Sequence, residues 1–109
     1  MGYISHDAII VTGWDKEKLE VARSKAVELE LPVSEIVDSE INGYVSFLIA
    51  PDGSKEGWAE SDAGDEKRDE WKRLVREQER LWIDWVHVVY GGDTPEACLV
   101  DTDRDEDGE

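Results

Sequence analysis

Leu81-Trp82-Ile83-Asp84-Trp85-Val86-His87-Val88-Val89-Tyr90 is the longest run of large apolar side chains in this chain of 109 residues. β-Branched and aromatic residues dominate the run, which predicts a β-strand. Because side chains alternate along a strand, Val86, Val88 and Tyr90 would lie on one face, and Trp85, His87 and Val89 on the other. Both faces are largely apolar, a pattern typical of a central strand that is covered on both sides.

The composition favours one domain, which we place at residues 1–100. A chain of 109 residues with five tryptophans can bury a modest core. Cys98 is the only cysteine, so no internal disulfide can form, and we expect a reducing compartment, the cytoplasm. The N-terminus does not resemble a secretory signal, and no apolar run approaches the ~20 residues that a membrane span requires.

The charge is strongly negative. Twenty-eight acidic residues against twelve basic ones give a net charge of −16. Such a chain repels phosphate groups and anionic lipids, so direct binding to nucleic acid or to a membrane surface is not expected. Basic proteins are the partners that this charge attracts. The alternative interpretation is that the charge only keeps the protein soluble.

The first half of the chain predicts a strand, a helix and a hairpin. Residues 8–12 form the first strand, and Asp15 is placed as the N-cap of a helix over residues 16–31 that Pro32 ends. Asn42-Gly43 is a strong turn signal between two further strands, at residues 33–38 and 44–50. Residues 33–50 are therefore expected to form a hairpin.

The second half adds a helix and one or two strands. Residues 55–64 are expected to be a surface loop, followed by a helix from Asp62 or Asp65 to Arg80 and the strand at residues 81–90. Most of the charged side chains of this helix are expected to form a solvated face. Residues 97–100 would return as a C-terminal edge strand, and residues 101–109 are expected to be a disordered acidic tail.

The order of elements predicts an α+β fold, namely a ferredoxin-like βαββαβ two-layer sandwich. This sandwich leaves one face of its sheet uncovered, whereas the strand at residues 81–90 is apolar on both faces. Either the loop at residues 55–64 covers the Trp-rich face, or that face is a contact between copies. The surplus of tryptophan favours self-association, so we expect a homo-oligomer.

No stretch of the sequence carries a recognisable catalytic motif. His87, flanked by valines, is expected to be a hydrogen-bonded core residue, and Cys98 a buried inert thiol. His6-Asp7 could form a base and its orienting partner, but no activated nucleophile is recognisable nearby. Residues 103–108 match the start of a calcium loop, but the twelfth position of the loop is missing. We therefore expect no enzyme, no metal site and no cofactor.

The feature that most favours a specific function is the stretch at residues 28–54, which is acidic and contains no Lys or Arg. Carboxylates along one edge of a domain can imitate a phosphate backbone and steer the protein to a basic surface. The alternative is an edge strand that is charged to prevent aggregation. The candidate protein-binding residues are Glu28, Glu30, Glu35, Asp38 and Glu40.

A second hypothesis is a small-molecule binding module, such as an oligomer that sequesters nucleotides. Aromatic rings would stack on a base and an arginine would contact a phosphate. The candidate ligand-binding residues are Trp58, Trp82, Trp85, Tyr90 and Arg76. An enzyme that uses His6 or His87 is the third hypothesis.

In size, acidity, α+β order and lack of catalytic motifs, the chain resembles small acidic accessory proteins encoded by phages and prophages. This resemblance rests on the composition of the whole chain and not on a shared motif. It implies an anti-defence role, in which the protein binds a host nuclease or a signalling nucleotide. The leading hypothesis is therefore a non-enzymatic protein that occupies the nucleic-acid-binding surface of a basic host protein.

Overall fold

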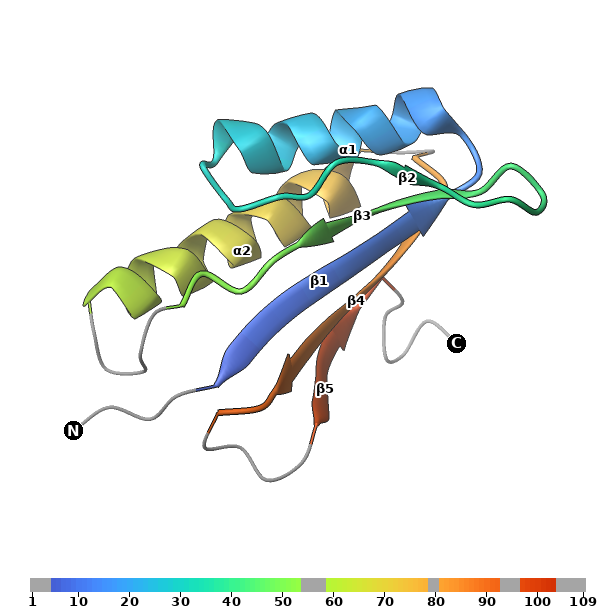
Figure 1. Cartoon of the computed structure of the whole chain (residues 1–109). Coiled ribbons are helices and arrows are strands. Elements are labelled where there is room, and N and C mark those ends of the chain that lie inside the picture. The colour runs from blue at the N-terminus through green and yellow to red at the C-terminus, as the bar shows by residue number, and fades with distance from the viewer. Residues whose placement is uncertain (1–4, 54–58, 79–80, 93–96, 104–109) are drawn as a thin grey trace.

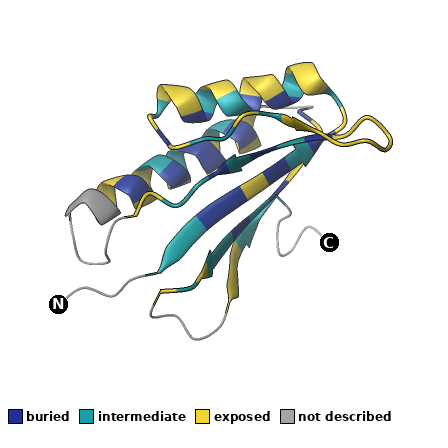
Figure 2. Ribbon diagram, viewed as in Figure 1, coloured by how far each residue is buried: buried dark blue, intermediate teal, exposed yellow. Residues whose placement is uncertain are grey.

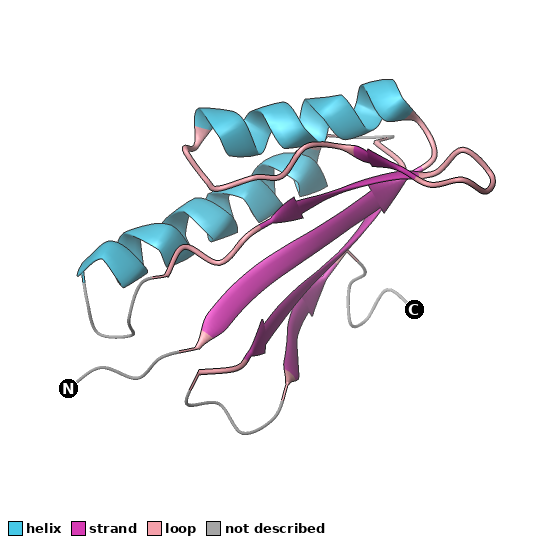
Figure 3. Cartoon of the chain, in the orientation of Figure 1, coloured by secondary structure: helices cyan, strands magenta, loops and turns pink. Residues whose placement is uncertain are grey.

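The computed structural model describes residues 5–53, 59–78, 81–92 and 97–103. It is an α+β structure of two layers, a five-stranded antiparallel sheet and two helices that lie on the same face of it (Figures 1 and 3). No described helix is long and apolar enough to cross a bilayer. The elements are β1 (His6–Gly13), α1 (Lys16–Glu28), β2 (Val37–Asp38), β3 (Val45–Ile49), α2 (Ala59–Glu77), β4 (Ile83–Tyr90) and β5 (Cys98–Thr102).

The sheet is built around β1 and β4. Its strand order is β2-β3-β1-β4-β5, so the predicted C-terminal edge strand is present beside β4. β1 and β4 pair antiparallel over their whole length, from His6 opposite Tyr90 to Gly13 opposite Ile83. The strand predicted from residues 81–90 therefore has a neighbour on each side, and β1 is the middle strand of the sheet.

The core lies between the sheet and the helices. Ile9 and Val11 of β1 are fully buried and face the helices, as strand alternation requires. Alternation between buried and exposed residues is visible along β1 in Figure 2. Trp71 of α2 is fully buried, donates a hydrogen bond from Nε1 to the carbonyl oxygen of Ala22 at 2.9 Å, and packs edge-on against Trp85. This tryptophan joins both helices to the sheet.

The first helix is shorter than expected at its C-terminal end. The carboxylate of Asp15 accepts hydrogen bonds from the amides of Glu17 and Lys18, as a helix N-cap does. The helix ends at Glu28 and not at residue 31, because Glu30 adopts a left-handed conformation with φ of 65°. Such a residue commonly ends a helix, so Pro32 lies beyond the helix and does not itself stop it.

The second helix begins earlier than expected. Residues 59–64, predicted as loop, belong to α2, and residues 54–58 lie outside the described part of the chain. The acidic residues of this stretch favour a helix N-terminus, whereas its small residues and low apolar content suggested a loop. Gly64 is buried in the helix beside the carboxylate of Asp52, where a larger side chain would collide with that carboxylate.

Two strand predictions differ at their bounds. The strand expected over residues 33–38 is reduced to Val37–Asp38 plus an isolated bridge between Val33 and Ile49. β5 extends to Thr102, two residues into the predicted acidic tail, and Asp101 and Thr102 pair with His87 and Val86 of β4. A bulge between His87 and Val88 shifts the register of this pairing. Residues 104–109 lie outside the described part of the chain.

Helix α2 covers the face of β4 that carries Trp85, and residues 55–58 of the loop expected to cover it lie outside the described part of the chain. Trp85 and His87 are buried on the helix side, whereas Val86, Val88 and Tyr90 lie on the other face of the sheet. No described helix covers that second face, which we call the open face. The expectation that both faces are covered is therefore wrong for the described residues.

Candidate functional site

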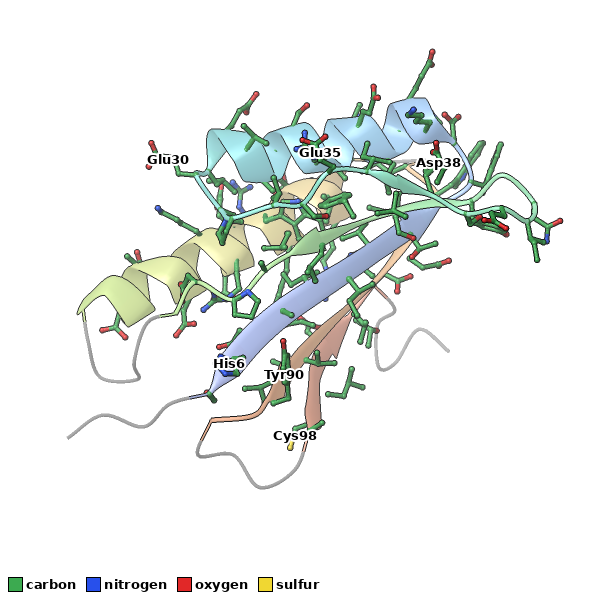
Figure 4. All side chains as sticks on the ribbon, viewed as in Figure 1. His6, Glu30, Glu35, Asp38, Tyr90 and Cys98 are labelled. Carbon is green, nitrogen blue, oxygen red and sulfur yellow. The ribbon has the colours of Figure 1, made fainter. Side chains whose placement is uncertain are left out.

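The acidic residues predicted as a binding site follow one edge of the molecule. Glu28 ends α1, Glu30 and Glu35 lie in the segment that leads to β2, Asp38 is in β2, and Glu40 is in the turn after it. All five are exposed, and Figure 4 shows Glu30, Glu35 and Asp38 spread along the side formed by α1 and β2. β2 is the outermost strand on this side of the sheet. We call these five residues the acidic edge.

Most of the acidic edge is free of internal ion pairs. Glu30 lies 3.9 Å from Nζ of Lys67, but the other four residues form no ion pair with any described residue. In contrast, every described lysine and arginine of α2 pairs with at least one carboxylate. The cations of α2 are therefore used within the fold, while the charge of the acidic edge remains available to a partner.

Helix α1 brings positive charge close to part of the acidic edge. Lys16 and Arg23 line a shallow groove of about 320 Å³ together with Glu35. Arg23 also donates a hydrogen bond from Nε to the carbonyl oxygen of Ser34 at 2.8 Å. The absence of Lys and Arg from residues 28–54 did not reveal these neighbours, because they come from the preceding helix. Asp38 and Glu40 are not among the groove-lining residues, so we place the unneutralised part of the edge there.

A second cluster of charges lies between α2 and the sheet, although the charged side chains of α2 were predicted to form a solvated face. Arg68 and Lys72 are 2% and 5% exposed, although both are on the strongly charged helix α2. They line a cleft of about 340 Å³, the polar cleft. Its other lining residues are Ser5, Asp7, Asp65, Asp69, His87, Val89 and Val100.

Asp7 and His87 form the centre of this cluster. His87 is buried and its Nε2 lies 2.9 Å from Oδ1 of Asp7, which confirms the prediction of a hydrogen-bonded core histidine. Oδ2 of Asp7 lies 3.8 Å from Arg68. The hydrogen bond from His87 lowers the pKa of Asp7, partial burial opposes this effect, and the charge of Arg68 adds to it. Asp7 is thus ionised and His87 donates to it from Nε2.

His6 and Asp7 do not form the pair that their adjacency suggested. They point to opposite faces of β1, because neighbouring side chains alternate along a strand. The ring of His6 lies 5.5 Å from that of Tyr90 on the open face. The partner of Asp7 is instead His87, which is 80 positions away along the chain.

Asp101 extends the cluster to β5. Its carboxylate lies 3.4 Å from Lys72 and 2.9 Å from Arg76, and Arg76 also donates to the carbonyl oxygen of Thr102. Burial raises the pKa of Asp101, but the hydrogen bonds from Arg76 and from the Thr102 amide outweigh it and leave the pKa lowered. These contacts tie α2 to a residue that the sequence placed in a disordered tail.

The polar cleft shows no nucleophile paired with its histidine. Nδ1 of His87 and Nε of Arg68 are buried without a hydrogen-bond partner, so no described hydroxyl or thiol contacts Nδ1. No group of three or more metal-ligating side chains was found among the described residues. Cys98 is exposed, which corrects the expectation of a buried thiol. Arg68 and Lys72 of α2 contact Asp7 of β1 and Asp101 of β5, so the cluster links α2 to the sheet through ion pairs.

The residues proposed for a small-molecule site do not converge. Trp58 lies outside the described residues, and Trp85 is buried in the core. Trp82 precedes β4 with φ of 54° and stacks on Trp14, whereas Tyr90 lies at the far end of β4. The guanidinium of Arg76 lies over the ring of Trp85 and is engaged by Asp101 and Thr102, as described above. The four described residues of this set therefore form no common binding site.

The comparisons with known proteins found no relative. No model of a protein family matches the chain, and neither the curated proteins nor the solved structures gave a significant match. The site has therefore to be interpreted from its own geometry.

Proposed function

We propose that this chain is a non-enzymatic binding protein of the phage accessory type, which uses its acidic edge to occupy a basic, nucleic-acid-binding surface of a host protein in the bacterial cytoplasm. A defence nuclease is the kind of target that this chemistry fits. The antiparallel order β2-β3-β1-β4, with both helices on one face, supports the ferredoxin-like interpretation of the fold. The fold alone says nothing of function, so the proposal rests on the surface.

One observation carries the proposal: the charge of the acidic edge is exposed and mostly unpaired, while the cations of α2 are paired within the fold. Asp38 lies in the edge strand β2 and Glu40 lies in the turn after it, where a partner can approach both. With a net charge of −16, the whole molecule attracts a basic surface, and these local carboxylates would determine which part of the molecule meets it.

A double charge reversal tests the proposal. Asp38→Lys with Glu40→Lys raises the net charge by four, and so does the matched control Asp62→Lys with Glu66→Lys on α2. Asp62 and Glu66 are also exposed and form no ion pair with described residues. The three proteins are immobilised and used to capture binders from bacterial lysate, and duplex DNA is then added to compete.

We expect the wild type and the control to retain a basic protein that duplex DNA or moderate salt releases. The Asp38→Lys, Glu40→Lys variant should retain at least about tenfold less of this protein than the wild type. Equal loss in both variants would mean that only total charge matters. Capture that DNA does not compete would contradict the mimicry of a nucleic acid.

A further inference from the structure

The open face of the sheet is arranged in rows of side chains that cross the strands. The pairing registers place Leu48, Ile10, Val86 and Thr102 in one row, and Ala8, Val88 and Leu99 in the next. His6 and Tyr90 form the row at one end. Val37, Ser46, Thr12 and Asp84 form the row at the other end.

The two middle rows are apolar except for Thr102, and accessible except for Ala8, which is 4% exposed. Ile10 is 46% exposed and Leu99 64% exposed, and Leu48, Val86 and Val88 are partly exposed beside them. Asp84 is the one carboxylate in the four rows, although 37% of the whole chain is charged. Figure 1 shows both helices on the opposite side of the sheet. A continuous apolar patch of this kind on an uncovered sheet marks an interface.

We propose that the open face binds a second copy of this chain and forms a symmetric, face-to-face dimer. Two such sheets pack about 10 Å apart through their apolar side chains. This contact goes beyond the proposed function, because it uses the opposite side of the molecule from the helices and none of the acidic edge.

The polar side chains at the two ends of the face favour a second copy as the partner. A twofold axis that lies between the sheets and perpendicular to the strands reverses the order of the rows in the second copy. The two middle rows then face each other, and the His6 row of one copy lies over the Asp84 row of the other. Each side chain stays over its own strand, so Asp84 lies over Tyr90 of the other copy, whose hydroxyl can donate a hydrogen bond to it, at both ends of the dimer. An axis parallel to the strands would instead place the Asp84 row of one copy against the Asp84 row of the other.

The size of the face indicates a modest affinity. Strands about 4.8 Å apart with a rise of about 3.3 Å per residue give the described strands a projected area of roughly 450 Å². A standard interface buries about 800 Å² of accessible surface per partner, so this contact is at the small end of specific interfaces and we expect a weak, reversible dimer.

Salt separates this contact from the binding of a basic partner. Two copies with a charge of −16 each repel one another, and added salt screens that repulsion. Dimerisation should therefore strengthen with salt, whereas binding of the acidic edge to a basic surface should weaken.

Sedimentation velocity of the full chain at about 0.05 M and about 0.5 M NaCl tests the dimer. We expect a larger dimer fraction at the higher salt, and a dissociation constant raised at least tenfold by Ile10→Lys or by Leu99→Lys. Each of these changes makes the net charge less negative by one, which on its own would favour association. Val27→Lys is the matched control, because Val27 is 49% exposed but lies on α1.

A chain that stays monomeric at about 200 μM in both salts would overturn the proposal, as would equal effects of Ile10→Lys and Val27→Lys. A reduced helical circular dichroism signal for Ile10→Lys would mean that this variant is misfolded. The dimer is then tested with Leu99→Lys, which lies on the edge strand β5. The twofold arrangement has its own test. His6→Asp should weaken the dimer and Asp84→Lys in the same chain should restore it, and failure of this rescue would exclude the arrangement.

Discussion

Asp7 shows how a single residue acquires its role from distant parts of the chain. It lies on the first strand, and its carboxylate binds His87 of β4 and lies near Arg68 of α2. A buried imidazole N–H needs an acceptor, and the buried guanidinium of Arg68 is balanced by Asp7 together with Asp52 and Asp65, because unpaired buried groups cost free energy. Asp7 therefore stabilises the docking of α2 on the sheet.

At the residue scale we predict that Asp7→Asn lowers the free energy of unfolding by about 1–3 kcal/mol at neutral pH. The pKa of Asp7 is lowered from 3.8 in the folded protein, so the contribution of its charge is present above pH 4 and is lost as the pH falls through the lowered pKa. The difference between wild type and variant should thus shrink below about pH 4.

Urea unfolding monitored by tryptophan fluorescence, repeated across acidic pH, measures this difference. Asp62→Asn is the control, because Asp62 is exposed on the same molecule and forms no ion pair with described residues. A difference that stays constant down to pH 2 would show that the charge of Asp7 is not what stabilises the fold.

At the scale of elements, the N-terminus of α1 depends on one side chain. The first amides of a helix have no partner within the helix, and the carboxylate of Asp15 accepts two of them. We predict that Asp15→Ala lowers the free energy of unfolding by about 1 kcal/mol. Asp15→Asn should keep most of the stability because an amide oxygen caps equally well, and an equal loss in both variants would exclude capping as the cause.

The two helices differ in how their sequences relate to their bounds. Asp15 gave the start of α1 correctly, because a cap is a local interaction. The start of α2 was predicted too late, because residues 59–64 have little apolar content. Gly64 lies against the carboxylate of Asp52, a contact that the helical periodicity of the sequence does not reveal. Likewise, the predicted solvated face of α2 includes Arg68 and Lys72, which are buried by strands far away in the sequence.

At the scale of the molecule, the negative charge is distributed unevenly. The acidic edge exposes unpaired carboxylates, the cleft under α2 contains paired charges, and the open face is nearly uncharged. The two proposed contacts use different surfaces and are expected to respond to salt in opposite directions. The two proposals therefore do not compete for the same part of the molecule.

The whole-molecule charge also predicts how stability responds to salt. Repulsion among unpaired carboxylates destabilises the compact state, and exposed ion pairs contribute only about 0–1 kcal/mol each, so screening should give a net gain. We expect the urea midpoint to rise with NaCl, and to rise less in the Asp62→Lys, Glu66→Lys variant, whose net charge is less negative by four. A midpoint that falls with salt would show that ion pairs outweigh the repulsion.

The order of the elements and the apolar faces of the strands and helices could be predicted from the sequence, because periodicity and turn residues are local properties. The large negative charge follows from the composition alone. The sequence also located the carboxylates of the acidic edge. Only the tertiary structure decided that Asp7 meets His87 and Arg68, that α1 brings Arg23 beside Glu35, and that one apolar face of the sheet stays uncovered. These contacts join residues tens of positions apart, and their energies depend on burial that exists only once the strands and helices have packed.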